Sequence, residues 1–420
     1  MRPFRAHLRW PLLLGACCLS TALHATPPAQ QPDRPEPAAS DYRQLNLELV
    51  DQHVIPRYRQ LSDATRQLEQ HARQFCAAGP DTVQAEREAL EQGWHQATDA
   101  WQAVQHIRFG PVELFMRSMR FSFWPDPRNT VGRQLDALLA AADPAALDPQ
   151  AFARGTIAVQ GFPALERLLT ADEPLGAEAG ARASKDTTDA ARYRCAVLVA
   201  IAHNLSSMAS DTLAGWLDGE GTAASGGSAA SAAHSLPAYR QVIADAAAEG
   251  GHYHLDREAT QDFFKSLNTA LELIADHKLA RPLGPSLQAA RPQLAEAWRS
   301  QRSLEYVRSN LAAAEALYLG ASVTADGADS GTAGGGGFSA FVRTVAGDGE
   351  LDALLRRALA QTRATAHGLS LPLEAAVQDP QARKQVEKLV REASALKALI
   401  SQRLAPALSI PVGFNALDGD

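Results

Sequence analysis

A group of charged side chains lies in the first third of the chain. Arg117 and Arg120 are three residues apart and would lie on one face of a helix. Asp126 follows them in the short run WPDP. These side chains would form either one wall of a charged pocket that binds a ligand, or a structural ion pair that holds the WPDP loop. Partly buried arginines need carboxylate partners under both interpretations.

Glu166 is a second candidate and lies in the run GFPALERLL, which begins at Gly161. Pro163 suits the first turn of a helix, where its missing N–H group would have no partner. Glu166 would then lie near the positive end of the helix dipole. It would bind a cation or anchor a ligand between helical bundles, or it would only stabilise the helix from a solvated position. A single carboxylate cannot hold zinc, which needs three or four ligands.

The two segments together resemble the imelysin-like family, also called insulin-cleaving metallopeptidases, which are bacterial cell-envelope proteins associated with iron uptake. The family carries a Gly-x-His-x-x-Glu motif on a helix. This chain has Gly161 and Glu166 at that spacing, with Pro163 in place of the histidine. The C-terminal run GFNALDGD, residues 413–420, also resembles one branch of the family, and the resemblance covers residues 41–420.

The resemblance implies a role in iron acquisition, with iron or another divalent or trivalent cation as the ligand and iron-uptake components as partners. Pro163 removes the histidine that would share one helix face with Glu166, so a zinc peptidase would lack its ligands. We therefore expect a non-enzymatic binding or accessory protein of metal uptake. The alternatives are an envelope zinc metallopeptidase and a structural or interaction lipoprotein without a small ligand.

His53 and Ser300 are candidates in other parts of the chain. His53 lies on the first predicted helix and would join Glu166 at a metal site if the fold brings the two helices together. The alternative is a lone histidine without a functional role. Ser300 lies two residues after Trp298 in the run EAWRSQRSL, which would mirror the charged WPDP segment in the second half of the chain. It would otherwise only cap a helix.

Two further groups carry metal-binding atoms. His252 and His254, in the run GGHYHL, have a spacing that would chelate a metal on a strand. They lie in a predicted loop, where an incidental surface pair is the simpler interpretation. Asn415, Asp418 and Asp420 end the chain with oxygen atoms suited to a hard cation, or they form a polar tail.

The composition indicates a globular helical protein. Hydrophobic residues make up 46% and charged residues 21% of the 420-residue chain. Abundant alanine and leucine, with only 6% aromatic residues, favour helix over strand. The net charge of −7 provides no general basic surface for nucleic acid, so we expect no nucleic-acid partner.

The N-terminus is typical of a secretion signal, which we assign to residues 1–25. Arginines precede an apolar run, residues 10–19, that is too short to span a bilayer. Two processing routes remain open: acylation of Cys17, which would be the only membrane attachment, and simple cleavage after Ala25. Residues 26–40 are rich in Pro, Ala and Gln and predict a disordered tether. The mature protein would lie in the periplasm or on a membrane of the cell envelope.

Cys76 and Cys195 are the two cysteines outside the predicted signal. An even number of cysteines in an oxidising compartment predicts a disulfide between them. Such a bond would join the end of the first helix to a helix more than a hundred residues later. The alternative is two buried free thiols.

Helical periodicity predicts an all-α fold of two helical bundles, residues 41–218 and 236–420. Residues 219–235 are almost entirely Gly, Ala and Ser and would link the bundles. Pro56 should kink the first helix, and Pro292 should interrupt a later one. The predicted helices span residues 41–77, 82–107, 112–121, 131–141, 149–159, 161–170, 190–217, 236–249, 256–277, 288–318, 338–345, 349–369 and 380–404.

One pair of segments suggests a divergent duplication. GFPALERLL, from Gly161, can be aligned with NLAAAEALY, from Asn310, so that Glu166 lies opposite Glu315. The alternative is chance, because any two helices rich in Ala and Leu align about this well.

Overall fold

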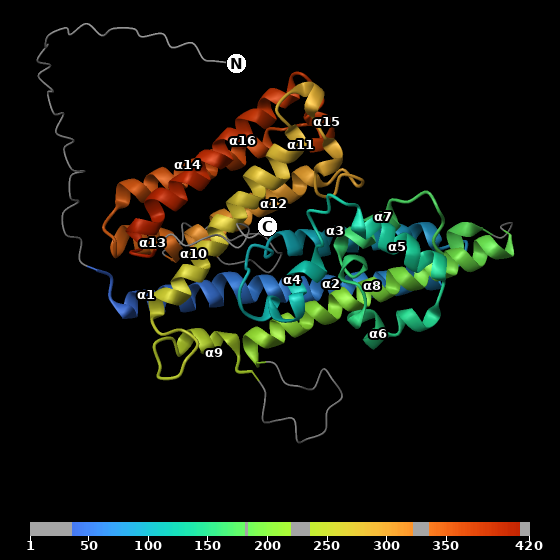
Figure 1. Ribbon diagram of the computed structural model, residues 1–420, viewed down its shortest axis with the longest axis horizontal. Helices are drawn as coiled ribbons and strands as arrows, with labels where there is room; N and C mark the ends of the chain where they lie inside the picture. The colour runs from blue at the N-terminus through green and yellow to red at the C-terminus, as the bar shows by residue number, and fades with distance from the viewer. Residues whose placement is uncertain (1–35, 181–183, 220–235, 322–335, 412–420) are drawn as a thin grey trace, which may run out of the picture. The chain divides into compact units, whose positions relative to one another are not determined.

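The structure is a computed structural model that describes residues 36–180, 184–219, 236–321 and 336–411 (Figure 1). Within these ranges the chain forms helices and irregular connections and no β-strand, which confirms the prediction of an all-α protein. Residues from Pro37 onward belong to one compact unit. The predicted signal, most of the tether, most of the linker and the C-terminal GFNALDGD lie outside the described residues.

The helices fall into long rods and short connecting turns. The long helices are α1 (Ala39–Leu49), α2 (Ile55–Ala77), α3 (Val83–Gln102), α5 (Thr130–Ala141), α8 (Lys185–Leu217), α10 (Asp256–Glu272), α12 (Ser303–Leu319), α14 (Gly349–His367) and α16 (Ala382–Leu399). The short ones are α4 (Arg117–Phe121), α6 (Pro149–Arg154), α7 (Phe162–Leu169), α9 (Tyr239–Ala244), α11 (Arg281–Leu283), α13 (Gly337–Thr344), α15 (Leu373–Ala376) and α17 (Ala405–Ala407). Helix α1 therefore begins at Ala39, inside the segment predicted as a tether.

The packing of the long helices places the core. Helix α2 packs along both α3 and α8, while α14 packs against α12 and α16. The earlier and later halves of the chain also contact each other, through α1 against α10 and α3 against α12 (Figure 1). One continuous cluster of buried apolar side chains runs through both halves. The division into two bundles joined by residues 219–235 stays a prediction.

Three π-helical segments interrupt the rods, at Val50–Val54, Leu273–Ala280 and Ile400–Leu404. Each ends two residues before a proline: Pro56, Pro282 and Pro406, respectively. Proline lacks the N–H group of the normal i→i−4 hydrogen bond, and its ring clashes with the carbonyl one turn earlier. A wider π turn accommodates both defects, so the kink predicted at Pro56 takes this form.

Four predicted helices differ from the structure. The segment predicted as helix 149–159 forms the short α6 and a 3₁₀ turn at Ile157–Val159, with a break at Gly155. The segment predicted as helix 112–121 consists of two 3₁₀ turns and the short α4, because Phe115 and Met116 both adopt a positive φ of 55°. Only α9 forms within the predicted helix 236–249. The predicted helix 288–318 begins only at Ser303. The residues before it form short 3₁₀ turns, and positive φ values at two of them, Ala297 and Gln301, break the helix.

The proposed alignment of α7 with Asn310 does not match helix starts. Helix α7 begins directly after Gly161, whereas Asn310 lies in the middle of α12. A closer counterpart is GFSAFVR, residues 337–343, which shares Gly, Phe, Ala and Arg with GFPALER, residues 161–167. Both runs form eight-residue helices, α7 and α13, although their first helical residues differ by one position in this alignment.

Cys76 and Cys195 are bonded, as predicted, with their Cα atoms 5.7 Å apart. The bond joins α2 to α8, which also pack along each other. No helix in the described ranges is long and apolar enough to cross a membrane.

Removing this disulfide should destabilise the protein, because the bond closes a loop of 119 residues and restricts the unfolded chain. We expect the Cys76→Ser/Cys195→Ser variant to lose about 2 to 5 kcal/mol of unfolding free energy. Urea unfolding with and without a reductant measures this. The reductant should lower the midpoint of the wild type and leave the double variant unchanged. Equal midpoints for wild type and variant would contradict the expectation.

Candidate functional site

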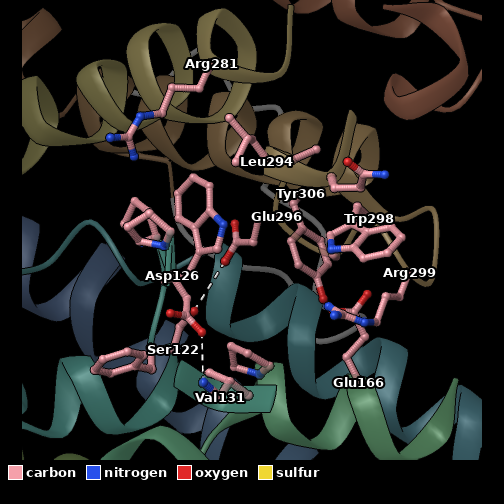
Figure 2. A pocket seen from close by; sticks show the side chains of 18 of the residues that line it. Ser122, Asp126, Val131, Glu166, Arg281, Leu294, Glu296, Trp298, Arg299 and Tyr306 are labelled. Atoms are coloured by element: carbon pink, nitrogen blue, oxygen red, sulfur yellow. Dashed lines mark hydrogen bonds between the residues drawn. The ribbon is translucent and has the colours of Figure 1, made fainter. Parts of the chain in front are cut away.

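A cavity of about 890 Å³ lies between the two halves of the chain (Figure 2). The earlier half contributes α3, residues 122–127 and the first turns of α5 and α7. The later half contributes residues 280–299 and Tyr306. Figure 2 shows Glu166, Trp298 and Arg299 on one side of the cavity and Ser122 and Asp126 on the other.

Glu166 lies in the first turns of α7 on the cavity wall and is buried. Its Oε1 atom accepts hydrogen bonds from the backbone N–H of Ser300 at 3.0 Å and from the Ser300 hydroxyl at 2.7 Å. Burial raises the pKa of Glu166, while these hydrogen bonds and the charge of Arg299 act in the opposite direction. The structure thus brings two of the predicted site residues, Glu166 and Ser300, into direct contact.

Gly161 allows α7 to start where it does. A Cβ atom at this position would collide with the backbone carbonyl oxygens of Arg120 and Phe121. Glycine is therefore required by the close approach of α4 to the start of α7. Pro163 follows in the first turn and lines the cavity three residues before Glu166.

A short irregular loop presents Ser300 to Glu166. Ala297 and Gln301, on either side of the loop, have φ values of 55° and 57°, in a region that residues other than glycine rarely occupy. Between them, Trp298 lies under the guanidinium group of Arg299, 4.4 Å from its carbon to the ring centre. Backbone strain of this kind is often found at functional sites, and here it occurs in the loop that contacts Glu166.

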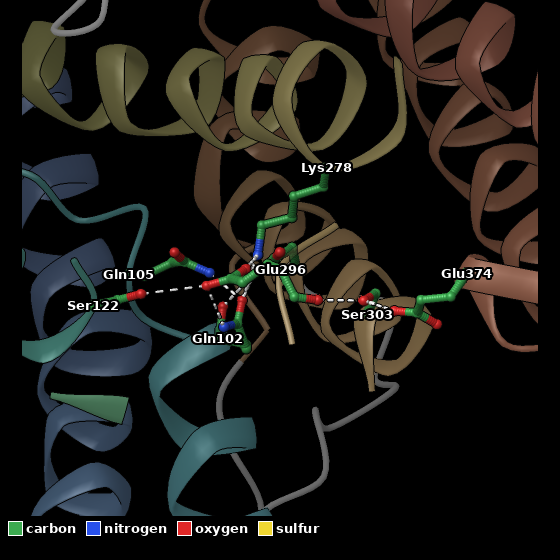
Figure 3. Close-up of polar contacts among 8 residues, drawn as sticks. Gln102, Gln105, Ser122, Lys278, Glu296, Ser303 and Glu374 are labelled. Atoms are coloured by element: carbon green, nitrogen blue, oxygen red, sulfur yellow. Dashed lines mark hydrogen bonds and ion pairs between the residues drawn. The ribbon is translucent and has the colours of Figure 1, made fainter. Parts of the chain in front are cut away.

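A buried ion pair supports the floor of the cavity. Lys278 and Glu296 are in direct contact, with side chains only 2% and 7% exposed. Lys278 Nζ also donates to Gln102 Oε1 at 2.6 Å, and the Ser122 hydroxyl donates to Glu296 at 3.3 Å (Figure 3). Burial lowers the pKa of Lys278, and the charge of Glu296 opposes that effect. Sequence analysis missed this pair, because Lys278 looks like an ordinary helix residue.

Asp126 also lines the cavity, but its carboxylate is engaged in capping α5. Its two oxygen atoms accept hydrogen bonds from the backbone N–H groups of Thr130 and Val131, both at 2.8 Å. A carboxylate at a helix N-terminus satisfies unpaired N–H groups and interacts favourably with the dipole. Asp126 thus fixes the start of α5 rather than pairing with the two predicted arginines.

The structure does not bring Arg117 and Arg120 to this cavity. Arg117 donates to the carbonyl oxygen of Pro111 at 2.9 Å and lies 3.7 Å from a carboxylate oxygen of Asp211. Arg120 donates to the carbonyl oxygen of Phe115 at 2.7 Å and to Gln160 Oε1 at 2.8 Å. Guanidinium groups can satisfy backbone carbonyls as well as carboxylates, so the arginines fix the irregular turns around α4 instead.

His53 is not among the residues that line the cavity with Glu166. It is fully buried, and its Nε2 atom lies 2.9 Å from Nε2 of His106. Burial and the charge of Arg57 lower the pKa of both histidines, to about 3 for His106. Both imidazoles are therefore neutral, and their mutual hydrogen bond replaces the predicted metal contact.

The arrangement defines an all-helical protein with a polar and aromatic cavity between its earlier and later helices. A sequence profile of the imelysin family matches residues 54–402. The chain belongs to the imelysin family.

Individual relatives agree with this assignment. The iron-regulated protein A of Synechococcus elongatus is 26% identical over 271 residues, which are 64% of this chain and 62% of that protein. The match thus covers less than two thirds of the relative's length. An imelysin-like protein from Psychrobacter arcticum has a similar structure, with a TM-score of 0.68, 20% identity and coverage of 91% of this chain and 100% of that chain.

A second structure extends the fold comparison. A protein from Parabacteroides distasonis, assigned as an iron-regulated protein A precursor, has a TM-score of 0.65 and 14% identity. The alignment covers 87% of this chain and 95% of that chain. At these identities, the two solved structures show a shared fold.

Breaking the Lys278–Glu296 pair should destabilise the protein strongly. Lys278→Met leaves Glu296 charged and buried, which should cost about 3 to 5 kcal/mol of unfolding free energy. The double variant Lys278→Met/Glu296→Gln should recover much of this loss, since glutamine can still accept from Ser122. Urea unfolding of the wild type, the two single variants and the double variant gives the coupling free energy between Lys278 and Glu296. Additive effects of the two substitutions would rule out a coupled pair.

The histidine pair should make stability depend on pH. Both histidines stay neutral when folded but take up protons when unfolded below about pH 6.5. The unfolded state then binds more protons, so stability falls as the pH drops. His106→Gln should reduce this slope by about 1.4 kcal/mol per pH unit between about pH 6 and pH 4. His254→Gln, at an exposed position, serves as the control. Urea unfolding at several pH values measures the slope of unfolding free energy against pH, and equal slopes for the wild type, His106→Gln and His254→Gln would refute the expectation.

Proposed function

We propose that this protein is a non-enzymatic binding or accessory component of iron or other metal uptake at the cell envelope, and that the cavity holds its ligand. The observation that carries the binding role is the cavity itself, whose volume of about 890 Å³ suits a small molecule. Its walls combine aromatic side chains with a few polar groups, as small-molecule sites do. Iron is suggested by the family and by the name of the cyanobacterial relative.

Three arginines on the cavity wall favour an anionic ligand. Among the described residues, the guanidinium groups of Arg281, Arg291 and Arg299 have no hydrogen-bond or ion-pair partner. Glu166 is hydrogen-bonded and Glu296 is ion-paired within the protein. The negative charge of Glu166 also interacts with Arg299 over a longer distance. The free cationic groups would therefore bind a metal that arrives as a negatively charged chelate, such as a ferric polycarboxylate.

The zinc-peptidase alternative finds little support in the residues present. Pro163 occupies the position on the cavity wall at which the family motif has histidine. In the ranges that the structure covers, no three His, Cys, Asp or Glu side chains are grouped so as to hold a metal ion. These residues do not fit a resident zinc ion.

Export to the envelope is the second part of the proposal. It rests on the sequence of residues 1–25, which lie outside the described part of the chain. Processing after Ala25 would release the protein into the periplasm, whereas acylation of Cys17 would attach it to a membrane. The Parabacteroides protein is named as a precursor, which is consistent with export of this chain.

Ferric citrate, an anionic chelate, is a suitable probe of the cavity. Hydrogen bonds to charged groups contribute about 1.5 to 3 kcal/mol each, so Arg299→Ala should weaken binding by about 10- to 150-fold. Isothermal titration calorimetry of the purified full chain measures the dissociation constant. The matched control is Arg154→Ala, which removes an exposed arginine outside the cavity and should leave the affinity unchanged.

Two results would overturn the proposal. The first is a wild-type protein that binds no ferric citrate, or an affinity that Arg154→Ala lowers as much as Arg299→Ala. The second is chelator-sensitive cleavage of an unfolded peptide by the same preparation. If Glu166→Ala abolished that cleavage, the metallopeptidase alternative would be supported instead.

A further inference from the structure

Two tyrosines and an aspartate form a hydrogen-bonded row away from the cavity. The hydroxyl oxygens of Tyr239 and Tyr253 are 2.9 Å apart, and the Tyr253 hydroxyl donates to Asp262 Oδ2, also at 2.9 Å. Tyr239 begins α9, Tyr253 lies in the connection to α10, and Asp262 lies on α10. None of the three lines the cavity described above. The row includes the middle residue of the run HYH that the sequence singles out.

We propose that Tyr239, Tyr253 and Asp262 form a binding site for a ferric ion. Phenolate and carboxylate oxygens are hard anionic donors, which suit a small, highly charged cation better than they suit zinc or copper. Two phenolates and one carboxylate carry three negative charges in total, and these balance the charge of Fe³⁺. The exposed imidazole of His252, whose ring centre lies 4.7 Å from that of Tyr253, is a further donor beside the row.

The spacing of the oxygen atoms fits such an ion. An octahedral site for a small hard cation has metal–oxygen distances of roughly 2.0 Å, which places neighbouring ligand oxygens roughly 2.8 to 2.9 Å apart. Both oxygen–oxygen distances in the row are 2.9 Å. Each neighbouring pair of oxygens in the row therefore already has the separation of two adjacent ligands of such an ion.

The surroundings hold the row in place and leave it accessible. The ring of Tyr239 packs edge-on against Trp216, with ring centres 5.1 Å apart, and Tyr253 is buried. The Asp262 side chain remains 24% exposed. Its other oxygen, Oδ1, pairs with Lys265 at 3.3 Å, while Oδ2 accepts from Tyr253.

Binding must release protons, and this gives the site a pH dependence. Each phenol loses its proton as its oxygen bonds to iron, so one Fe³⁺ displaces two protons and forms a neutral centre with two phenolates and one carboxylate. A tyrosine phenol has an ordinary pKa of about 10 and is protonated near neutral pH without metal. The apparent affinity should therefore rise by about 100-fold per pH unit, which is tenfold for each proton released.

Titration of the full-chain protein with ferric nitrilotriacetate tests the site. Iron bound to phenolate gives a visible charge-transfer absorption band, and we expect this band to saturate at one iron per protein. Tyr253→Phe should abolish the band. Asp262→Asn should weaken binding by at least about 100-fold, more than the loss of an outer-shell partner usually costs.

The matched control is Tyr318→Phe, which removes a buried tyrosine that donates to a single carboxylate, Asp352, at 2.9 Å. This variant should keep the band. Absence of the band in the wild type, its persistence in folded Tyr253→Phe protein, or an unchanged iron affinity of folded Asp262→Asn protein would overturn the site. Arg299→Ala should lose ferric citrate affinity and keep the band, so failure here and failure of the cavity proposal are distinguishable.

Discussion

The buried ion pair between Lys278 and Glu296 is the interaction on which the cavity depends. Lys278 comes from a π-helical segment, Glu296 begins the irregular loop, and both contact Gln102 at the end of α3. The side-chain amide of Asn310, on α12, donates to the backbone carbonyl oxygen of Gln102 at 2.6 Å. Elements from both halves of the chain therefore meet at one buried charge pair, and separating Lys278 from Glu296 would leave a buried charge unpaired. The position of the Ser300 loop opposite Glu166 follows from this anchor.

The sequence predicted the regular parts of the fold because the physical signal there is local. Helices such as α2, α8 and α16 show apolar residues at helical spacing over many turns, and the disulfide was predicted from the cysteine count and the expected oxidising compartment. The predictions for the irregular segments failed because the signal there is not local. Ala297 and Gln301 are good helix formers, so nothing in their identity indicates the left-handed conformation that contacts with distant residues impose. The helix predicted across them therefore does not form.

The candidate site was predictable only in part. Glu166 and Ser300 were singled out for their local context and do meet, whereas the contact of His53 with His106 joins residues that the sequence does not relate. Arg117 and Arg120 were expected to pair with carboxylates, but they mostly donate hydrogen bonds to carbonyl oxygens. Arg120 nevertheless affects the cavity indirectly, because it binds Gln160 directly before Gly161 and so helps to fix the start of α7. Spacing along one helix shows which residues share a face but not what lies opposite that face.

The π-helical segment at Val50–Val54 has a consequence for comparison with relatives. A π turn contains one residue more than the α-helical turn that it replaces, and one residue corresponds to about 100° of rotation around the axis. The rod formed by α1 and α2 can thus face α10 at one end and α8 at the other. Deleting one residue here would restore a regular helix and rotate one end away from its partner. Alignments of the family should therefore contain single-residue gaps at this turn. Such a gap would mark a relative whose rod presents different faces to α10 and α8.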